Sequence, residues 1–251
     1  MKFTAVIITF NEERNIERCV QSLVPLTDDI VVVDSFSEDA TVDICHKYGA
    51  RVFQRSFAGY SDQKNWANSQ ANYDYIFSID ADEVVSAELQ QSIQNIQEPL
   101  AETAFIVNRL TNYCGKWIRH GGWYPDKKTR LWNKNNAIWV GLIHETVSFS
   151  KPVATIPLKG DLQHYSYISI DDHHNQAMKF AKLSAVQMFE NCKKTTLLTI
   201  LVAPAFRFLK TYLFKGGFLD GYYGFVIAKI SARATFYKHL WLYKKKCDKN
   251  L

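Results

Sequence analysis

The chain has 251 residues, of which 47% are hydrophobic, 14% aromatic and 22% charged. This composition supports a folded core and excludes a disordered chain, a collagen-like repeat and a small disulfide scaffold. The net charge of +5 is a modest excess that leaves an anionic partner open. The five cysteines are scattered without a C-x-x-C pair, and the start lacks the long apolar region of a secretory signal. We therefore expect a reduced, cytosolic chain.

The first hundred residues alternate between short apolar runs and segments with helical spacing. Strands are predicted at 3–9, 30–33, 51–53 and 75–79, and helices at 12–23, 41–48, 61–71 and 86–96. Alternation of this kind, with short connections, is typical of βαβ units. We expect an α/β fold with a mostly parallel sheet flanked by helices.

The pattern changes after residue 103. Short strands are predicted at 105–107, 129–132, 137–140 and 146–149, and helices alone from residue 169, at 171–191, 204–214 and 223–243. We therefore divide the chain into a domain of residues 1–168, with halves 1–103 and 104–168, and a helical extension of residues 169–251. The longest uncharged stretch of the C-terminal third, 195–206, is shorter than the roughly 18 to 20 residues that span a bilayer, so no transmembrane helix is predicted.

Carboxylates follow three of the predicted strands. Glu12 comes after the first, Asp34 ends the second, and Asp80 and Asp82 follow the fourth. Ligands of an open parallel sheet bind beyond the carboxyl ends of its strands, and carboxylates gathered there repel one another unless a cation lies among them. A lone Asp34 or a lone D-x-D turn is equally a simple cap. Together they favour a site for a hard divalent cation completed by a nucleotide diphosphate.

Absent motifs narrow the class of enzyme. The sequence has no G-x-G-x-x-G after its first strand, no G-x-x-x-x-G-K-[ST] and no G-x-S-x-G. A dinucleotide-binding fold, a P-loop enzyme and a serine hydrolase with a nucleophile elbow are therefore not expected. Phosphates are expected to meet a metal ion rather than a glycine loop.

Three further groups of residues can carry chemistry. His144-Glu145 places an imidazole beside a carboxylate, as a general base requires, although a core histidine and a surface glutamate explain the pair equally. His173 and His174 are expected to be solvated at the start of a helix. The loop around Trp123 and Tyr124 offers aromatic faces for a sugar ring, and Arg119 and Arg130 offer charge for an anionic group, whereas structural packing explains some of the aromatics.

At this point the sequence resembles the family 2 glycosyltransferases, which have the GT-A fold. The resemblance is carried by AVIITFNEE (5–13), VVVDS (31–35) followed by Asp39 and Thr41, and SIDADE (78–83). The later G-x-x-H-E segment and the stretch around GGFLDG (216–221) resemble the branch of lipopolysaccharide-core β-glucosyltransferases. The resemblance covers nearly the whole chain.

The resemblance implies a role for each matching residue. The nucleotide would be held by Thr9, Asn11, Glu12, Asp34, Asp39, Lys64 and Asp80, and Asp82 would coordinate Mg²⁺ or Mn²⁺, with His164 as a further metal ligand. Where many relatives have an Asp or a Glu-Asp pair, this chain has His144-Glu145, so we expect Glu145 to be the base and His144 to orient it. Independently of the resemblance, the chemistry of the aromatic loop leads us to expect that the acceptor contacts Arg119, Trp123, Tyr124 and Arg130.

The resemblance also implies the reaction: metal-dependent, inverting transfer of a hexose from a nucleotide sugar, with UDP-glucose the expected donor and a glycolipid or lipopolysaccharide core the expected acceptor. Two other functions stay open from the residues. A sugar-nucleotide nucleotidyltransferase would need a glycine- and lysine-rich N-terminal loop, whereas TFNEERN is acidic. A non-catalytic sugar-nucleotide or nucleic-acid binding module would not need His144-Glu145.

The C-terminal helices carry the positive charge of the chain. Residues 177–251 contain 14 Lys and Arg against three acids, together with many aromatic residues. Basic residues beside an aromatic, apolar helix face favour an anionic membrane surface, here through residues 196–246, and a location on the cytoplasmic face of the plasma membrane. A helical cap on the sheet is the alternative. No motif for nucleic acid accompanies the charge, so nucleic acid is not an expected partner.

Overall fold

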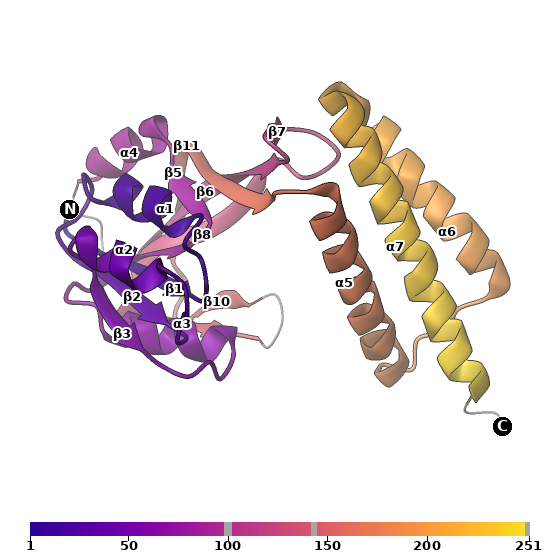
Figure 1. The fold of residues 1–251 in the computed structure, drawn as a ribbon, viewed down its shortest axis with the longest axis horizontal. Coiled ribbons are helices and arrows are strands. Elements are labelled where there is room, and N and C mark those ends of the chain that lie inside the picture. Colours follow the sequence, from indigo (N-terminus) through magenta and orange to yellow (C-terminus); the bar gives the residue numbers. More distant parts are fainter. Residues whose placement is uncertain (98–101, 142–144, 249–251) are drawn as a thin grey trace. The chain divides into compact units, whose positions relative to one another are not determined.

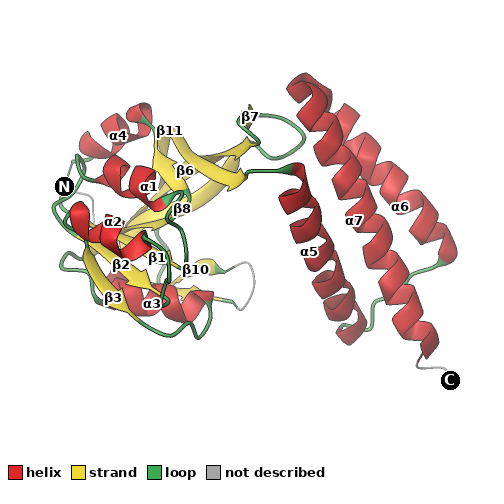
Figure 2. Cartoon of the chain, in the orientation of Figure 1, coloured by secondary structure: helices red, strands yellow, loops and turns green. Residues whose placement is uncertain are grey.

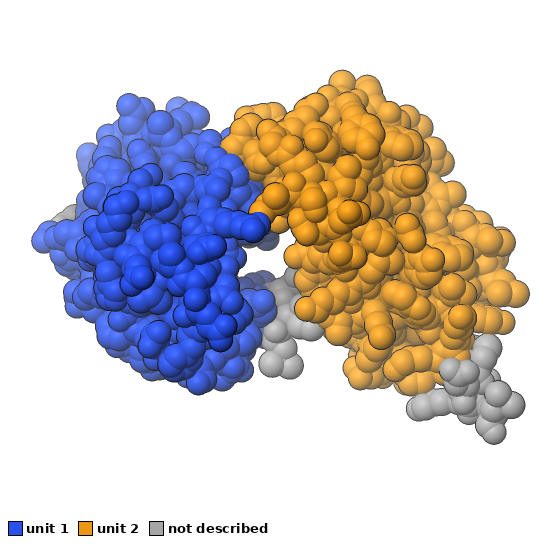
Figure 3. All heavy atoms as spheres, viewed as in Figure 1, with its two compact units in different colours: residues 1–109, 126–165 blue, residues 110–125, 166–251 orange. Residues whose placement is uncertain are grey.

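The computed structural model describes residues 1–97, 102–141 and 145–248. It divides the chain into two compact units, one of residues 1–109 and 126–165 and the other of residues 110–125 and 166–251 (Figure 3). The chain passes from the first unit to the second along strand β6 (Thr103–Tyr113) and returns at the start of β8 (Asp126–Asn133). It leaves the first unit for the last time near the end of β11 (Ala154–Tyr167).

The first unit is built on one large sheet. Its strand order is β3-β2-β1-β4-β8-β6-β11-β5, and β1, β2, β3 and β4 pair in parallel (Figure 1). The strands of the unit are β1 (Thr4–Thr9), β2 (Ile30–Asp34), β3 (Arg51–Gln54), β4 (Tyr75–Asp80), β5 (Glu83–Val85), β6 (Thr103–Tyr113), β8 (Asp126–Asn133), β9 (Ala137–Val140), β10 (Thr146–Phe149) and β11 (Ala154–Tyr167). Its helices are α1 (Ile16–Leu23), α2 (Thr41–Lys47), α3 (Tyr60–Ser69), α4 (Ala87–Gln94) and the short 3₁₀ helix η1 (Lys134–Asn136).

Helices cover both faces of the parallel strands, which is why these strands are apolar throughout. On one face, Ile7 and Val32 pack with α1, α2 and α4. On the other face, Val6 and Val33 pack with α3 and with Trp139 of the β9–β10 hairpin. Ser86 caps α4 by accepting a hydrogen bond from the N–H of Leu89. The predicted fold class, an α/β sheet flanked by helices with a helical C-terminal extension, is confirmed.

Beyond β4 the sheet departs from the sequence prediction. The pairs β4–β8, β6–β8 and β5–β11 are antiparallel, so the parallel arrangement belongs to the first four strands of the chain. The strand predicted at 105–107 is the eleven-residue β6, and β11 was not predicted at all. Its sequence, ATIPLKGDLQHYSY, contains Pro157 and Gly160, which obscure the strand pattern.

The second unit contains three long helices and the end of β6, which pairs with β7 (Lys116–Ile118). Helix α7 packs against both α5 and α6 (Figure 2). The helices are α5 (Ile170–Glu190), α6 (Leu197–Leu209), the π-helical turn η2 (Lys210–Phe214), the 3₁₀ helix η3 (Gly217–Asp220) and α7 (Gly221–Asp248). Gly224 lies against η3 so closely that a Cβ there would come within 1.8 Å of the Gly217 carbonyl oxygen.

Two boundaries in this unit differ from the prediction. A helix was expected at 204–214. Instead α6 starts at Leu197, because Thr196 caps it by accepting from the N–H of Thr199, and Pro204 lies inside the helix. Continued by η2, this stretch reaches Phe214 and is longer than the uncharged run 195–206 from which the absence of a spanning helix was argued.

A buried aromatic cluster holds the second unit together at the start of α5. The rings of Tyr113, Trp123 and Tyr167 contact His173, Tyr223 packs against Tyr113, and the Tyr113 hydroxyl lies 2.9 Å from His173 Nδ1. The expectation that His173 is solvated is therefore wrong, because the ring is only 6% exposed. Burial, with a smaller contribution from His174, lowers the pKa of His173 to about 4.

This histidine gives the second unit a pH-dependent stability. Because the pKa is lower in the folded than in the unfolded state, the unfolded state binds a proton first as the pH falls from about 6.5 to about 4. We expect the free energy of unfolding to fall by about 3 kcal/mol over that window. Urea denaturation followed by circular dichroism would show a flatter pH profile for His173→Gln. The exposed His46→Gln serves as the control, and equal slopes for both variants would contradict the assignment.

Candidate active site

The carboxyl ends of three parallel strands meet at one edge of the first unit. Thr9 at the end of β1 pairs with Asp34 at the end of β2, and Ile8 pairs with Asp80 at the end of β4. The structure thus brings together Thr9, Asp34 and Asp80, as expected for strand ends in parallel register. The Thr9 hydroxyl is buried and has no hydrogen-bond partner among the described residues.

The loops after β1 and β2 are tied to each other. Asp34 is fully buried and accepts hydrogen bonds from the Ser37 hydroxyl and, at 2.8 Å, from the Ser37 N–H. The Asn11 N–H donates to Ser37 Oγ at 2.8 Å, and Asn11 Oδ1 accepts from the Glu38 N–H at 2.9 Å. Asn11 has a φ of 53°, a conformation that asparagine tolerates better than most residues. The result is a preformed polar loop pair beside the strand ends.

Glu12 and Asp39 extend this loop pair. The Glu12 N–H donates to Thr41 Oγ1 at 2.8 Å, and the Glu13 N–H donates to Asp39 Oδ2 at 3.0 Å. Asp39 also accepts from the Thr41 N–H at 3.0 Å and thereby fixes the start of α2. Burial raises the pKa of Glu12; the hydrogen bond from Asn15 opposes the rise, and the charges of Asp82 and Asp39 add to it. Glu12 thus belongs to the same electrostatic group as the strand-end acids.

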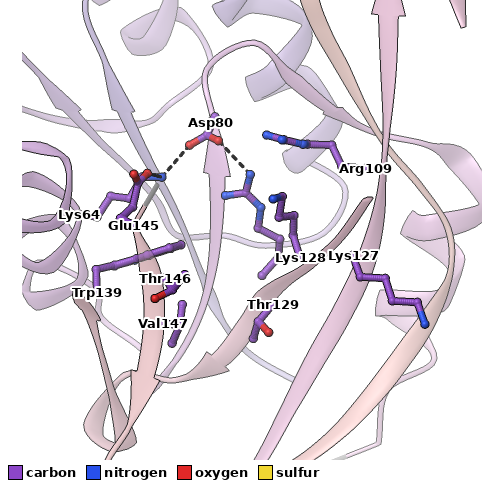
Figure 4. A pocket seen from close by; sticks show the side chains of 11 residues that line it. Lys64, Asp80, Arg109, Lys127, Lys128, Thr129, Trp139, Glu145, Thr146 and Val147 are labelled. Carbon is purple, nitrogen blue, oxygen red and sulfur yellow. Dashed lines mark hydrogen bonds and ion pairs between the residues drawn. The ribbon is translucent and has the colours of Figure 1, made fainter. Parts of the chain in front are cut away.

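Asp80 lies between two buried cations (Figure 4). Lys64 Nζ is 3.0 Å from Asp80 Oδ1, and Arg130 is 2.9 Å from Asp80 Oδ2. Arg130 also contacts Glu83 Oε1 at 2.6 Å, while Glu83 Oε2 accepts from the Asp80 N–H at 2.9 Å. Burial alone would raise the pKa of Asp80, but Arg130 and Lys64 hold it well below its usual range. Asp80 is therefore an ionised group inside a fixed network.

Asp82 and His164 form a second pair beside this network. His164 on β11 lies opposite Glu83 of β5, and its Nε2 is 3.1 Å from Asp82 Oδ2. Burial disfavours the charged imidazole, but the hydrogen bond and charge of Asp82 outweigh burial and raise the pKa of His164. The His164 Nδ1 atom is buried and has no hydrogen-bond partner among the described residues.

The two residues predicted to bind a metal ion are thus adjacent, and they fit one. The Asp82 carboxylate suits Mg²⁺ or Mn²⁺, an imidazole nitrogen such as that of His164 suits a transition metal rather than Mg²⁺, and phosphate oxygens can supply further ligands. The described residues contain no group of three or more His, Cys, Asp and Glu side chains arranged around one metal position. A cation here would therefore depend on the substrate for part of its coordination.

Glu145 faces Asp80 from the chain segment between β9 and β10. Its Oε1 atom is 2.8 Å from Lys64 Nζ, so Lys64 bridges the two carboxylates. Lys64 Nζ also lies 4.6 Å from the centroid of the Trp139 ring. Burial raises the pKa of Glu145, but the hydrogen bond and charge of Lys64 outweigh it and lower the pKa. His144, the predicted partner of Glu145, lies outside the described residues.

Asp80, Glu145, Lys64 and Arg130 line one cleft of about 440 Å³ in the first unit (Figure 4), whereas Asp34, Asp82 and His164 are not among its lining residues. Its lining residues are Lys64, Asp80, Arg109, Lys127, Lys128, Thr129, Arg130, Trp139, Glu145, Thr146 and Val147. Arg109 is held by Asp126 at 2.8 Å and lies 3.5 Å from Glu83. The cleft therefore combines carboxylates with several cations, as a site for an anionic substrate requires.

The four predicted acceptor residues belong to different units. Arg130 is 3% exposed and belongs to the Asp80 network of the first unit, whereas Arg119, Trp123 and Tyr124 belong to the second unit. There the N–H of Arg119 is 3.3 Å and that of His120 is 2.8 Å from the carboxylate of Asp220. The Arg119 guanidinium lies 5.4 Å from the Tyr124 ring, and Trp123 packs in the aromatic cluster.

Sequence reasoning missed Glu83 and gave Arg130 a different role; Trp139, expected to serve structural packing, does pack in the core and also lines the cleft. Glu83 is fully buried, and a buried carboxylate in a strand requires a cation nearby. The signal was available in Asp80-Ala81-Asp82-Glu83, where three acids meet at a buried strand end. The identity of the cation was not, since Arg130 is 47 residues away from Glu83.

The comparisons with known proteins identify the class. The model of glycosyl transferase family 2 matches residues 4–154, which include the strand-end carboxylates and Glu145. An uncharacterised glycosyltransferase of Rickettsia typhi is 33% identical over 246 residues, covering 94% of this chain and 84% of that protein. The chain belongs to glycosyl transferase family 2, and it is a glycosyltransferase.

Two further proteins are similar over most of the chain. The lipopolysaccharide core biosynthesis glycosyltransferase LpsC of Rhizobium meliloti is 26% identical over 258 residues, covering 95% of this chain and 93% of that protein. Among solved structures, S. aureus TarS 1–349 in complex with UDP aligns with the whole chain and 92% of that chain, at 15% identity and a TM-score of 0.49.

Proposed function

We propose that the protein transfers a hexose, with inversion, from a UDP-sugar such as UDP-glucose to a hydroxyl group of a glycolipid or lipopolysaccharide-core acceptor. The observation that carries the proposal is the arrangement at the sheet edge. Asp34 and Asp80 end two parallel strands on either side of β1, and Asp80 and Glu145 line a cleft together with the buried cations Lys64 and Arg130. The similarity to LpsC supports the acceptor class. A cytoplasmic location at the plasma membrane belongs to the same proposal.

The loop pair after β1 and β2 would bind the nucleotide. Asp34 and Asn11 are already held by hydrogen bonds with Ser37 and Glu38. The two loops therefore need little further ordering when the nucleobase of the donor binds. The Thr9 hydroxyl, at the end of β1 beside Asp34, has no hydrogen-bond partner among the described residues and could bond to the nucleotide. Glu12 and Asp39 would line the loop, with Asp39 acting through the start of α2.

Asp82 and His164 would hold a divalent cation. When bound, such a cation neutralises charge that develops on the diphosphate leaving group. Asp80 is held by Arg130 and Lys64, so its carboxylate is fixed in position for the ribose or the metal's other ligands. If Nε2 of His164 bound the cation, the ring proton would lie on Nδ1, which is buried and has no hydrogen-bond partner among the described residues.

Glu145 would act as the general base. It takes the proton of the acceptor hydroxyl while that oxygen attacks the anomeric carbon from the face opposite the diphosphate. The bond from the anomeric carbon to the diphosphate oxygen breaks, and UDP leaves with the electron pair. In the structure Glu145 is paired with Lys64, which weakens it as a base. The diphosphate of a bound donor would attract Lys64 away from Glu145. Without the Lys64 charge beside it, the pKa of Glu145 would rise, and Glu145 would be a stronger base.

A thermal-shift and turnover experiment tests the proposal. We expect UDP-glucose with Mn²⁺ to raise the unfolding midpoint more than either alone, since a ligand that binds the folded state stabilises it. Slow release of UDP should accompany this shift. Asp82→Ala should abolish the Mn²⁺-dependent part, whereas Asp43→Ala, an acidic residue of α2, should preserve it. Full metal-dependent transfer by Asp82→Ala would show that the metal site is wrong, and no response to any UDP-sugar would refute the donor class.

A further inference from the structure

The second unit carries an exposed apolar surface on α6, η2 and η3. The spacing of the α6 side chains places them on one half of the helix, opposite Ile200, the buried residue of α6. We call this the α6 surface; its members are between 43% and 78% exposed and are Leu197, Leu198, Leu201, Val202, Phe206, Leu209, Leu213, Phe214, Phe218 and Leu219. Contiguous apolar patches of this kind are rare on soluble monomers and mark interaction sites.

The hydropathy of this stretch is unusual for a helix exposed to water. Within the described part of the chain, Leu197–Phe214 is a helical stretch long and apolar enough to cross a membrane, judged by length and composition alone. Its mean hydropathy is 1.5 over 18 residues, and 11% of it is buried. Core helices of soluble proteins pass the same composition test, but they do so because they are mostly buried. Here the apolar side chains face outward.

The chain segment that carries the α6 surface has charged side chains of one sign. Between Asn191 and Leu219 the sequence contains no Asp or Glu, and its cations are Lys193, Lys194, Arg207, Lys210 and Lys215. All five are exposed. The next acid, Asp220, is 4% exposed and accepts a hydrogen bond from the His120 N–H, so it does not face the surface charge. Within residues 191–219, the exposed charged side chains are therefore all cations.

Exposed apolar residues together with exposed cations indicate which partner the α6 surface binds. A second copy of the chain would bring the same cations face to face and would repel. An anionic lipid bilayer offers acyl chains for the apolar residues and negative headgroups for the cations. Arg207 and Lys210 lie inside the 18-residue stretch, where a crossing helix would carry them into the hydrocarbon. A helix that lies along the interface keeps both in the headgroups.

We propose that the α6 surface docks on an anionic bilayer, with α6 and η2 lying along the membrane interface. The second unit as a whole suits this partner, because its sequence contains 16 Lys and Arg against 5 Asp and Glu. The proposal does not depend on the donor, the metal or the base proposed for the first unit, since every residue of the α6 surface lies in the second unit.

Vesicle flotation of the full chain tests the docking. We expect binding to vesicles of phosphatidylcholine with phosphatidylglycerol, at least about tenfold weaker binding to phosphatidylcholine alone, and a loss of binding in high salt. Leu198→Glu/Leu201→Glu should weaken binding to the mixed vesicles by at least about tenfold. Leu183→Glu provides the matched control, because this leucine of α5 is 41% exposed and lies outside the α6 surface.

Two readouts keep the outcome clear. Circular dichroism and release of UDP from the donor are expected to be unchanged in the double variant, since both leucines are 70% exposed. Equal binding by the double variant and the Leu183→Glu control would overturn the proposal. A dimer in light scattering without lipid, abolished by the double variant, would also overturn it in favour of self-association. If the wild type binds the vesicles but releases no UDP from any UDP-sugar, the function proposed for the first unit is refuted and the membrane docking is not.

Discussion

Replacing Glu145 by Gln is expected to lower kcat for glycosyl transfer by about a thousandfold, within the range measured for removal of a general base. The amide keeps the size and a hydrogen-bond acceptor for Lys64 but cannot take the acceptor proton. Donor binding, measured by the thermal shift with UDP-glucose and Mn²⁺, should change little. Steady-state kinetics on one acceptor would separate the two quantities.

The matched control is Glu88→Gln, which replaces an exposed glutamate in the first turn of α4. Its kcat should equal that of the wild type. If Glu145→Gln retained near-normal kcat, the base would have to be another group at the cleft. If instead the variant lost the donor-induced thermal shift as well, Glu145 would serve binding rather than proton transfer.

The contact between Lys64 and Glu145 is expected to influence the pH dependence of kcat/KM. Because Lys64 lowers the pKa of Glu145, the free enzyme should keep its base ionised to a pH below the usual range of a glutamate. In Lys64→Gln, burial is no longer opposed by Lys64, and the pKa of Glu145 rises. The acidic limb of the kcat/KM profile, which reports the free enzyme, should therefore move to higher pH in this variant. An unshifted limb would separate Lys64 from the base.

The first half of the fold was predictable because its strands are local and apolar on both faces. Four strands and four helices were placed within a few residues, and parallel register then implied that Thr9, Asp34 and Asp80 are neighbours. The α/β fold class and family 2 membership predicted from the sequence are confirmed. The roles assigned to individual site residues stay predictions.

The second half was less predictable, because its pairings join distant segments. Nothing near Glu145 in the sequence indicates Lys64, which is 81 residues away. His164 lies on β11, where Pro157 and Gly160 hide the strand pattern. Arg130 was interpreted as an acceptor contact because an arginine next to aromatics suits an anionic ligand. Its burial against Glu83 is a tertiary property that the local sequence does not contain.

Arg130 is for this reason the position where we expect the largest loss of stability. The guanidinium contacts both Asp80 and Glu83, and Glu83 is fully buried. Arg130→Met leaves the buried Glu83 carboxylate beside that of the partly exposed Asp80, with Lys64 and Arg109 as remaining cations nearby. Breaking a buried ion pair from one side costs about 3 to 5 kcal/mol, because the remaining charge is left uncompensated. Urea denaturation of the full chain measures this loss.

The comparison with Arg109 distinguishes burial from charge. Arg109 also faces Glu83, but at 3.5 Å, and its side chain is 23% exposed and paired with the half-exposed Asp126. Arg109→Met should therefore cost no more than about 1 kcal/mol. Adding Glu83→Gln to Arg130→Met should recover part of the lost stability, since one buried charge is removed and the two effects are coupled. Equal losses for both arginines, or simple additivity in the double variant, would show that Arg130 does not neutralise Glu83. If instead the double variant recovers part of the stability but no glycosyl transfer, Arg130 has two roles: it neutralises Glu83, and it holds Asp80 in position.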